Sequence, residues 1–283
     1  TVLDRNGVGI DIDGTGGDVT FGTVTMANPK GVTASAITID GTTGGTVTFE
    51  GDHVIDQEGV PTAFQFLGVV NIARTTANSG AIHWSGGTLK NGSLSPIDPL
   101  FETDPLVRAS EFARVRIQDA TLEGGHIGVR FSAGGQWDLS GLTFRGIQRE
   151  GVRARTGQGG LVIRVTDSAF EETGLEAETG AHPFGFPAVR VTRVSHPLDA
   201  VLDGLTFGTR DASVWAIVSA GTACVALTDL TPAEPLGSPE HRLHPNSHLE
   251  KLYLEPVVDV IGPIERHGPI VDVAAGTCQR PSF

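Results

Sequence analysis

The sequence predicts an all-β solenoid, in which short parallel strands stack on one another as the coils of a single-stranded β-helix. Two observations lead to this prediction: a phrase of eight residues recurs through the middle of the chain, and a shorter phrase follows it at matched spacing. Apolar residues alternate within both phrases, which is the period of a strand with one buried face. Strands that return every few tens of residues are the signature of a solenoid, whose coils bury one continuous apolar core.

The eight-residue phrase marks the first strand of each coil. By their first residue numbers its copies begin 33, 22, 26, 37 and 25 residues apart, and they span residues 82–89, 115–122, 137–144, 163–170, 200–207 and 225–232. In each copy two apolar residues at alternate positions precede an Asp or a Gly. Asp bonds its own backbone and Gly accepts a positive φ, so this position predicts a tight bend inside the coil. The bend residues of the last five copies are Asp119, Gly141, Asp167, Gly204 and Asp229.

The shorter phrase predicts a second strand at residues 128–131, 151–154 and 188–191. Its valines would point into the core, and the residues between them, Arg130, Arg153 and Arg190, would point outward as a ladder. Guanidinium groups pair with carboxylates, sulfates and phosphates. Neighbouring coils lie about 4.8 Å apart, close to the length of a sugar unit, so the ladder is a candidate site for an anionic polysaccharide. The alternative is that these arginines pair with nearby acidic residues on a solvated face.

The two ends of the chain differ from its middle. Residues 10–21 match residues 37–49 with one inserted residue, which indicates two earlier coils, and the interval from 91 to 108 is expected to be a loop. After residue 232, Pro, His and charged residues crowd together, followed by a few more strands at 251–260 and 270–273. We therefore expect two parts, a β-helix over residues 1–232 and a C-terminal capping or oligomerisation tail over residues 233–283.

Composition excludes some partners. The chain has 283 residues and a formal net charge of −13, which disfavours nucleic acid as a ligand. No segment approaches the roughly 20 apolar residues of a membrane span. No basic start with an apolar run marks a secretion signal, and whether Thr1 follows removal of an initiator Met or a processing cut stays open.

The two cysteines allow more than one reading. Cys224 alternates with inward-facing Val225 and is expected to face outward, where Cys278 in the tail could reach it. A disulfide and two free thiols both stay open. Neither the number nor the spacing of the cysteines suggests a metal site, and we expect no metal and no cofactor.

Three carboxylates are candidates for catalysis. Glu123 and Glu171 each follow the inner apolar residue of their coil, and Arg145 occupies the same place in the coil between them. A Glu–Arg–Glu stack could hold two carboxylates within range of a glycosidic bond, as inverting or retaining hydrolysis requires. The alternative is a plain charge ladder, like that of Arg116, Asp138 and Arg164 in the first strand. Asp138 is the third catalytic candidate, and Arg145 is a further ligand-binding one.

Through the repeated Ile-x-Val-x-Asp-x-x-Phe-like phrase, residues 10–232 resemble the pectin-lyase-like right-handed β-helix superfamily. The resemblance implies a right-handed coil, in a superfamily that includes pectate lyases, glycoside hydrolases, epimerases, bacterial adhesins and phage tailspikes. It does not extend to their catalytic segments: His126 lacks the following Gly of the Gly-His-Gly segment of polygalacturonases, and their Asn-Thr-Asp and Asp-Asp segments are missing. A function drawn from the fold alone is an analogy.

Within this superfamily we expect a tailspike-like virion or surface protein, favoured as a trimer, that recognises a host-surface polysaccharide. The absence of a secretion signal, the two cysteines and the non-coil tail favour this reading. An anionic glycan is favoured, because Trp84, Trp137 and Trp215 are all expected at or beside core positions. The alternatives are a secreted polysaccharide lyase or glycoside hydrolase acting on an acidic glycan, and a non-catalytic structural or adhesin solenoid. Whether the protein is an enzyme stays open.

Overall fold

The structure is a computed structural model. It describes residues 2–4, 9–14, 16–27, 35–40, 44–56, 69–73, 80–91, 105–109, 113–132, 134–157, 159–174, 186–208, 214–232, 241–245 and 250–283. Within these residues every regular element is a β-strand and no helix is present. The prediction of an all-β fold is therefore confirmed for the described part of the chain.

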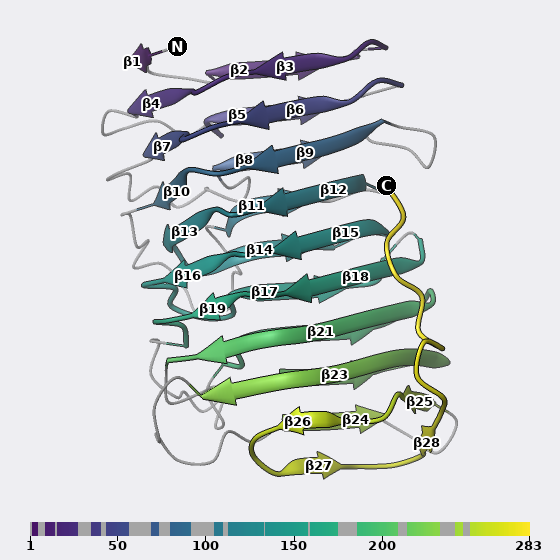
Figure 1. Ribbon diagram of the computed structural model, residues 1–283. Coiled ribbons are helices and arrows are strands. Elements are labelled where there is room, and N and C mark those ends of the chain that lie inside the picture. The colour runs from purple at the N-terminus through teal and green to yellow at the C-terminus, as the bar shows by residue number, and fades with distance from the viewer. Residues whose placement is uncertain are drawn as a thin grey trace.

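The strands pair in parallel and form two sheets, which we call sheet A and sheet B (Figure 1). Sheet B contains β2 (Ile10–Asp13), β5 (Ile37–Asp40), β8 (Val70–Ala73), β11 (Pro105–Ala109), β14 (Ile127–Phe131), β17 (Val152–Arg155), β20 (Val189–Arg193), β22 (Val214–Val218), β24 (His241–Pro245) and β27 (Ile264–Arg266). Sheet A contains β1 (Val2–Asp4), β3 (Val19–Phe21), β4 (Thr25–Ala27), β6 (Val47–Glu50), β7 (Val54–Asp56), β9 (Ala81–Ser85), β10 (Thr88–Asn91), β12 (Ala113–Gln118), β13 (Thr121–Gly124), β15 (Gly135–Ser140), β16 (Thr143–Arg145), β18 (Leu161–Thr166), β19 (Ala169–Phe170), β21 (Leu198–Phe207), β23 (Thr222–Pro232), β25 (Lys251–Leu254), β26 (Val258–Val260) and β28 (Ile270–Asp272).

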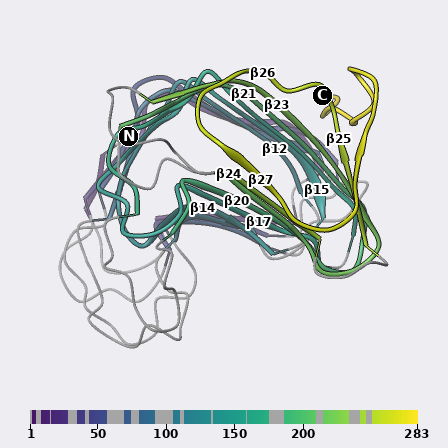
Figure 2. The same ribbon diagram turned by 90° about the horizontal axis from the view of Figure 1, so that it is seen from below.

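The strands are arranged in layers. In each layer a sheet B strand is followed along the chain by sheet A strands, as β14 is followed by β15 and β16 (Figure 1). Seen along the stack, β14, β17 and β20 of sheet B face β12, β15 and β21 of sheet A across the core (Figure 2). This arrangement of stacked parallel strands is compatible with a parallel β-helix.

The core follows from the alternation of the sequence. β18 alternates buried and half-buried side chains along its whole length, with Leu161, Ile163 and Val165 buried. The aromatic members of the phrase stack from layer to layer: the ring centroids of Phe144 and Phe170 lie 4.6 Å apart, and those of Phe170 and Phe207 lie 5.5 Å apart. Burial of each such side chain stabilises the fold by about 1.5–3 kcal/mol.

The bends inside the layers have the predicted backbone. The φ angles are 54° at Asp119, 63° at Gly141, 49° at Asp167, 63° at Gly204 and 47° at Asp229. All five lie in the left-handed region, which Asp tolerates better than most residues and Gly adopts freely. The prediction of a tight bend at this position of the phrase is confirmed.

Two boundaries differ from the prediction. The interval expected to be a loop ends in β11, because Leu106 and Val107 are buried in the core and Pro105 stands at the first position of the strand, where a missing N–H is tolerated. Residues 92–104 of that interval lie outside the described residues. The parallel stacking also continues beyond residue 232, since β24 pairs with β22, β25 with β23, and β28 with β25.

After β28, residues 273–283 leave the sheets and run back across the outer face of sheet A toward β12; we call them the C-terminal strap (Figure 1). The backbone N–H of Gln279 donates to Asp199 at 3.0 Å, and that of Ser282 donates to Gln136 at 3.0 Å. Arg114 on β12 donates to the carbonyl oxygen of Ser282, also at 3.0 Å. The strap thus ties together strands from several layers.

Candidate functional site

The arginine ladder predicted from the sequence is present on sheet B. Arg130, Arg153 and Arg190 are direct neighbours on β14, β17 and β20. The same position is continued in the following strands by Trp215, Arg242 and Glu265, and it is preceded by Arg108 on β11. We call these seven residues the sheet B row: Arg108, Arg130, Arg153, Arg190, Trp215, Arg242 and Glu265.

Two arginines of the sheet B row are paired with a buried carboxylate that is not part of the row. The carboxylate of Glu150, which has no exposed surface, lies 3.8 Å from a guanidinium nitrogen of Arg153 and 3.6 Å from one of Arg190. Only 15% and 23% of these two arginine side chains is exposed. The alternative prediction, that stacked arginines pair with a nearby acid, therefore describes Arg153 and Arg190. No motif in the sequence pointed to Glu150, although Arg153 follows it by three residues.

A basic hollow of about 190 Å³ lies at the carboxyl ends of β14 and β17. Arg130, Arg153 and Arg155 contribute to its wall. The hydroxyl-bearing residues Ser132 and Ser195 border it as well. Guanidinium and hydroxyl donors in one concavity can bind a carboxylate, sulfate or phosphate group.

A second, larger hollow of about 470 Å³ lies further along the same row, and we call it the aromatic hollow. It is lined by Trp215, Ile217, Arg242, His244, Glu265 and His267. These residues come from β22, β24, β27 and the residue that follows β27, and all of them are half-buried or exposed.

Contacts around the aromatic hollow link its polar groups. The guanidinium carbon of Arg242 stands 5.3 Å from the ring centroid of Trp215, and its Nε lies 3.4 Å from a carboxylate oxygen of Glu265. The same carboxylate group lies 3.2 Å from Nε2 of His267. The His267 ring is edge-on to His244, with centroids 5.4 Å apart. An aromatic surface thus adjoins a guanidinium, a carboxylate and two imidazoles, a set that can hold an apolar ring face and orient polar substituents.

Sequence reasoning missed this hollow. Trp84 and Trp137 are buried, and Trp215 stands beside core positions, facing outward between the buried Val214 and Ala216. The alternation of inward and outward positions along β22 would have placed Trp215 on the outer face. The partners of Trp215 come from residues beyond 232, which the prediction assigned to a tail and therefore did not align with the ladder.

Of the candidate carboxylates, Glu123 lies on β13 of sheet A and Glu171 directly follows β19 of the same sheet, and neither lines a hollow of sheet B. Glu123 is in register with Lys90 and Arg145. Lys90 and Glu123 are 3.3 Å apart, and Arg145 donates two hydrogen bonds to Glu171, at 2.9 and 2.6 Å. Donation of these hydrogen bonds to Glu171 raises the pKa of the Arg145 guanidinium above its ordinary value. The predicted stack is thus confirmed as a ladder of alternating charge. The catalytic roles of Glu123 and Glu171 remain predictions.

Asp138 occupies a different position on sheet A. Its side chain is 1% exposed and lies between two arginines, accepting a hydrogen bond from Arg116 at 3.2 Å and two from Arg164 at 2.8 Å. The hydrogen bond to Asp138 raises the pKa of the Arg164 guanidinium. On the strap side, the ring of Phe283 covers Arg116, with 4.5 Å between the guanidinium carbon and the ring centroid. The structure brings Asp138 together with Arg116 and Arg164 and not with Glu123 or Glu171.

Comparison with known proteins adds no name to this description. No protein family model matches the chain, and searches of the curated proteins and of the solved structures found no match. Among the described residues no helix is long and apolar enough to cross a lipid bilayer.

Proposed function

We propose that this chain is a right-handed parallel β-helix of the pectin-lyase-like kind, which recognises an acidic polysaccharide laid along the outer face of sheet B. The observation that supports the proposal is the continuous row from Arg130 to Glu265, which adjoins the basic hollow near one end and the aromatic hollow at the other. Six successive strands at about 4.8 Å spacing make the row roughly 24 Å long, enough for several sugar units in an extended chain.

Each part of the row suits one part of such a ligand. In the basic hollow, Arg130 and Arg155 supply guanidinium groups for a carboxylate or sulfate, on a chain whose net charge of −13 otherwise repels anions. In the aromatic hollow, Trp215 supplies an apolar surface for a sugar ring, and Arg242 supplies a cation beside it. Ligand binding would draw Arg242 away from Glu265, because the carboxylate of the ligand and that of Glu265 compete for the same guanidinium.

The tailspike-like reading is part of this proposal. An extended face that binds a polymer suits a virion or cell-surface protein that recognises a host-surface polysaccharide, and a trimer would present several such faces at once. Light scattering of the purified chain, with a test of resistance to SDS, checks the assembly. A stable trimer supports the virion reading, whereas a monomer favours a secreted or passenger protein.

Binding is tested by calorimetric titration of uronate-containing, sulfated and neutral polysaccharides into the full chain. The expected result is binding of an acidic polymer that is weakened about 30-fold by Trp215→Ala, the loss of a hot-spot side chain. Arg155→Ala is expected to lower the affinity and to make the affinity less dependent on salt concentration. Arg145→Ala on sheet A is the matched control and leaves the affinity unchanged. Loss of binding in the Arg145 variant alone would move the site to sheet A.

A second candidate function is a polysaccharide lyase or hydrolase acting on the same acidic glycan, favoured by the Glu265–His267 contact of 3.2 Å inside the aromatic hollow. A carboxylate that orients an imidazole is a common acid–base arrangement. Release of reducing ends from the bound polymer, abolished by His267→Ala, would support this activity. Activity lost on Glu123→Ala or Glu171→Ala would instead support the sheet A candidates, and full activity in both variants excludes them. Binding without cleavage supports a non-catalytic adhesin.

A further inference from the structure

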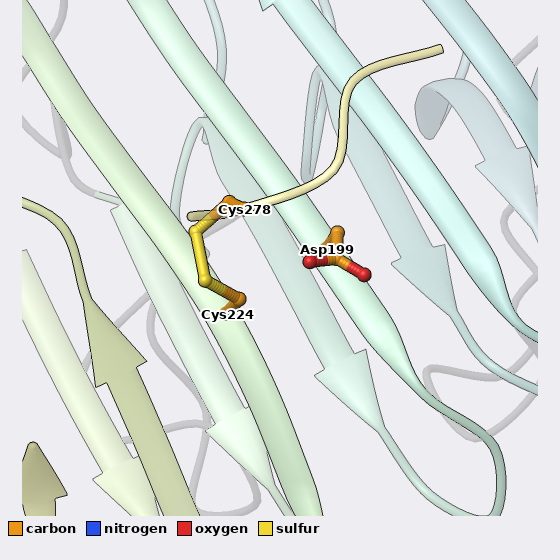
Figure 3. Close-up of side chains that lie close together, drawn as sticks. All are labelled: Asp199, Cys224 and Cys278. Carbon is orange, nitrogen blue, oxygen red and sulfur yellow. A yellow bond between two sulfur atoms is a disulfide. The ribbon is translucent and has the colours of Figure 1, made fainter. Parts of the chain in front are cut away.

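The C-terminal strap is fixed to sheet A at a cluster of three potential metal ligands. Asp199 on β21 and Cys224 on β23 are direct neighbours in the sheet, and Cys278 of the strap forms a disulfide with Cys224, with 5.3 Å between the Cα atoms. One carboxylate oxygen of Asp199 and the two sulfur atoms all lie within 4.8 Å of one another. Figure 3 shows the Asp199 side chain beside the disulfide, on the same outer face.

A second carboxylate borders the cluster. Glu255 is 4% exposed and accepts a hydrogen bond from the backbone N–H of Cys278 at 2.6 Å. Glu255 is itself paired with Arg280, whose guanidinium nitrogen lies 3.2 Å from the carboxylate, so it is not counted among the candidate metal ligands.

Each ligand type in the cluster is one that zinc accepts. Zn²⁺ is bound in proteins by thiolates and carboxylates in tetrahedral geometry, with Zn–S distances of about 2.3 Å. Two of the ligands stand on neighbouring strands of a rigid sheet, and the third is brought to them by the strap, whose other anchors at Gln136 and Arg114 do not depend on the sulfur atoms. These anchors keep Cys278 near the two ligands on the sheet when the covalent bond is opened, although the strap is then held less firmly.

We propose that, once the disulfide is reduced, Cys224, Cys278 and Asp199 bind one zinc ion with a water molecule as fourth ligand. Reduction by a thiol adds two electrons and two protons to the disulfide and turns the thiol reductant itself into a disulfide. Each cysteine then releases its proton to solvent as its sulfur bonds to Zn²⁺, and the Asp199 carboxylate binds as the third protein ligand. The metal takes the place of the covalent bond in holding the strap against sheet A.

This site differs from the expectation drawn from the sequence, which was that the cysteines hold no metal. Cys224 and Cys278 are 54 residues apart, and Asp199 is contributed by another layer, so no ligand spacing is visible along the chain. The proposal does not depend on polysaccharide binding, because the cluster lies on the outer face of sheet A.

The test uses the full chain, reduced with a phosphine under exclusion of oxygen and then freed of reductant. Zn²⁺ is titrated against a chromogenic chelator, and Co²⁺ is used as a spectroscopic probe of thiolate ligation. The expected result is about one Zn²⁺ per reduced chain, a thiolate-to-cobalt absorption band, and no stoichiometric binding to the oxidised chain. Failure of the reduced chain to bind one Zn²⁺ would overturn the proposal without the use of any variant.

Variants then assign the ligands. Cys278→Ser is expected to abolish stoichiometric binding, and Asp199→Asn is expected to weaken it on the order of tenfold. Asp203→Asn, on the same strand β21, is the matched control and leaves the affinity unchanged. Circular dichroism confirms that each variant retains its fold. Binding that survives Cys278→Ser, or that is as tight in Asp199→Asn as in the wild type, contradicts the ligand assignment.

Discussion

The Oδ1 atom of Asp167 lies 2.8 Å from the point at which a Cβ on Gly204 would stand. The two residues form the bends of neighbouring layers, and the same relationship joins Asp119 to Gly141. In these two pairs the Asp side chain fills the space beside the next bend, which favours a Gly there. The contact accounts for the alternation of Asp and Gly from residue 119 to residue 204, whereas the neighbouring bends at Asp229 and Asp259 are both Asp.

Gly204→Ala is expected to lower the free energy of unfolding by about 1–3 kcal/mol, because Ala adopts a positive φ at a cost and its Cβ meets the Asp167 carboxylate. Chemical denaturation measures the change. In the background of Asp167→Gly the obstruction is gone, so the same substitution should cost only the backbone part, about 1 kcal/mol. Equal costs in the two backgrounds would show that the contact with Asp167 plays no part.

Phe170→Ala is expected to destabilise the fold by about 3–5 kcal/mol, because it removes a fully buried ring from between Phe144 and Phe207 and leaves a cavity that rigid strands cannot close. Phe170→Leu keeps most of the volume and should cost less. Denaturant midpoints of both variants provide the measurement, and a loss below 1 kcal/mol for the Ala variant would mean that the layers relax into the space.

Two buried histidines predict acid sensitivity. The side chains of His53 and His241 have no exposed surface, and each accepts a backbone hydrogen bond at Nδ1, from Val24 at 3.1 Å and from Val214 at 3.3 Å. Burial lowers the pKa of both imidazoles below its ordinary value. The unfolded chain therefore binds protons more readily, so their contribution to stability is complete above about pH 6.5 and is lost as the pH falls through the lowered pKa values.

Thermal unfolding between pH 7.5 and 5 tests this expectation. The wild-type chain should lose stability over this range, and His53→Gln should show a smaller dependence on pH, whatever its stability at pH 7.5. A wild-type curve that stays flat down to pH 5, before the carboxylates titrate, would contradict the assignment of these two groups as neutral.

Reduction of the disulfide should weaken the attachment of the strap. The bond closes a loop with a sequence separation of 54, for which the chain-entropy account gives a stabilisation of up to about 4 kcal/mol. Cys224→Ser/Cys278→Ser in metal-free buffer should therefore unfold at lower denaturant concentration and expose residues 273–283 to proteases. Cleavage of the strap at equal rates in the oxidised chain and in this variant would show that the other contacts suffice.

Asp138→Asn separates a structural role from a catalytic one. Loss of the buried charge leaves Arg116 and Arg164 facing each other across one layer, and we expect a destabilisation of about 1–3 kcal/mol, reduced from that of a fully buried pair because both arginines are partly exposed. Denaturation of the variant measures this loss. Unchanged stability together with lost depolymerising activity would support a catalytic role for Asp138.

The sequence alone determined the local geometry of this protein. Alternation in residues such as Leu161, Ile163 and Val165 fixed which face is buried, and Asp or Gly at residues 167 and 204 fixed the bends, since both properties depend on residues that are neighbours along the chain. The outward ladder of Arg130, Arg153 and Arg190 followed from the same period, because a repeated phrase places equal positions side by side.

The tertiary structure alone decided what those positions contact. Glu150 beside Arg190, Trp215 beside Arg242, and Cys278 against Cys224 are contacts between layers or between the strap and a sheet. The turns between layers differ in length, so the register of one layer on the next cannot be counted along the chain and is set instead by packing of the core. Both hollows of sheet B and the cysteine cluster depend on that register, and for this reason they became visible only in the folded chain.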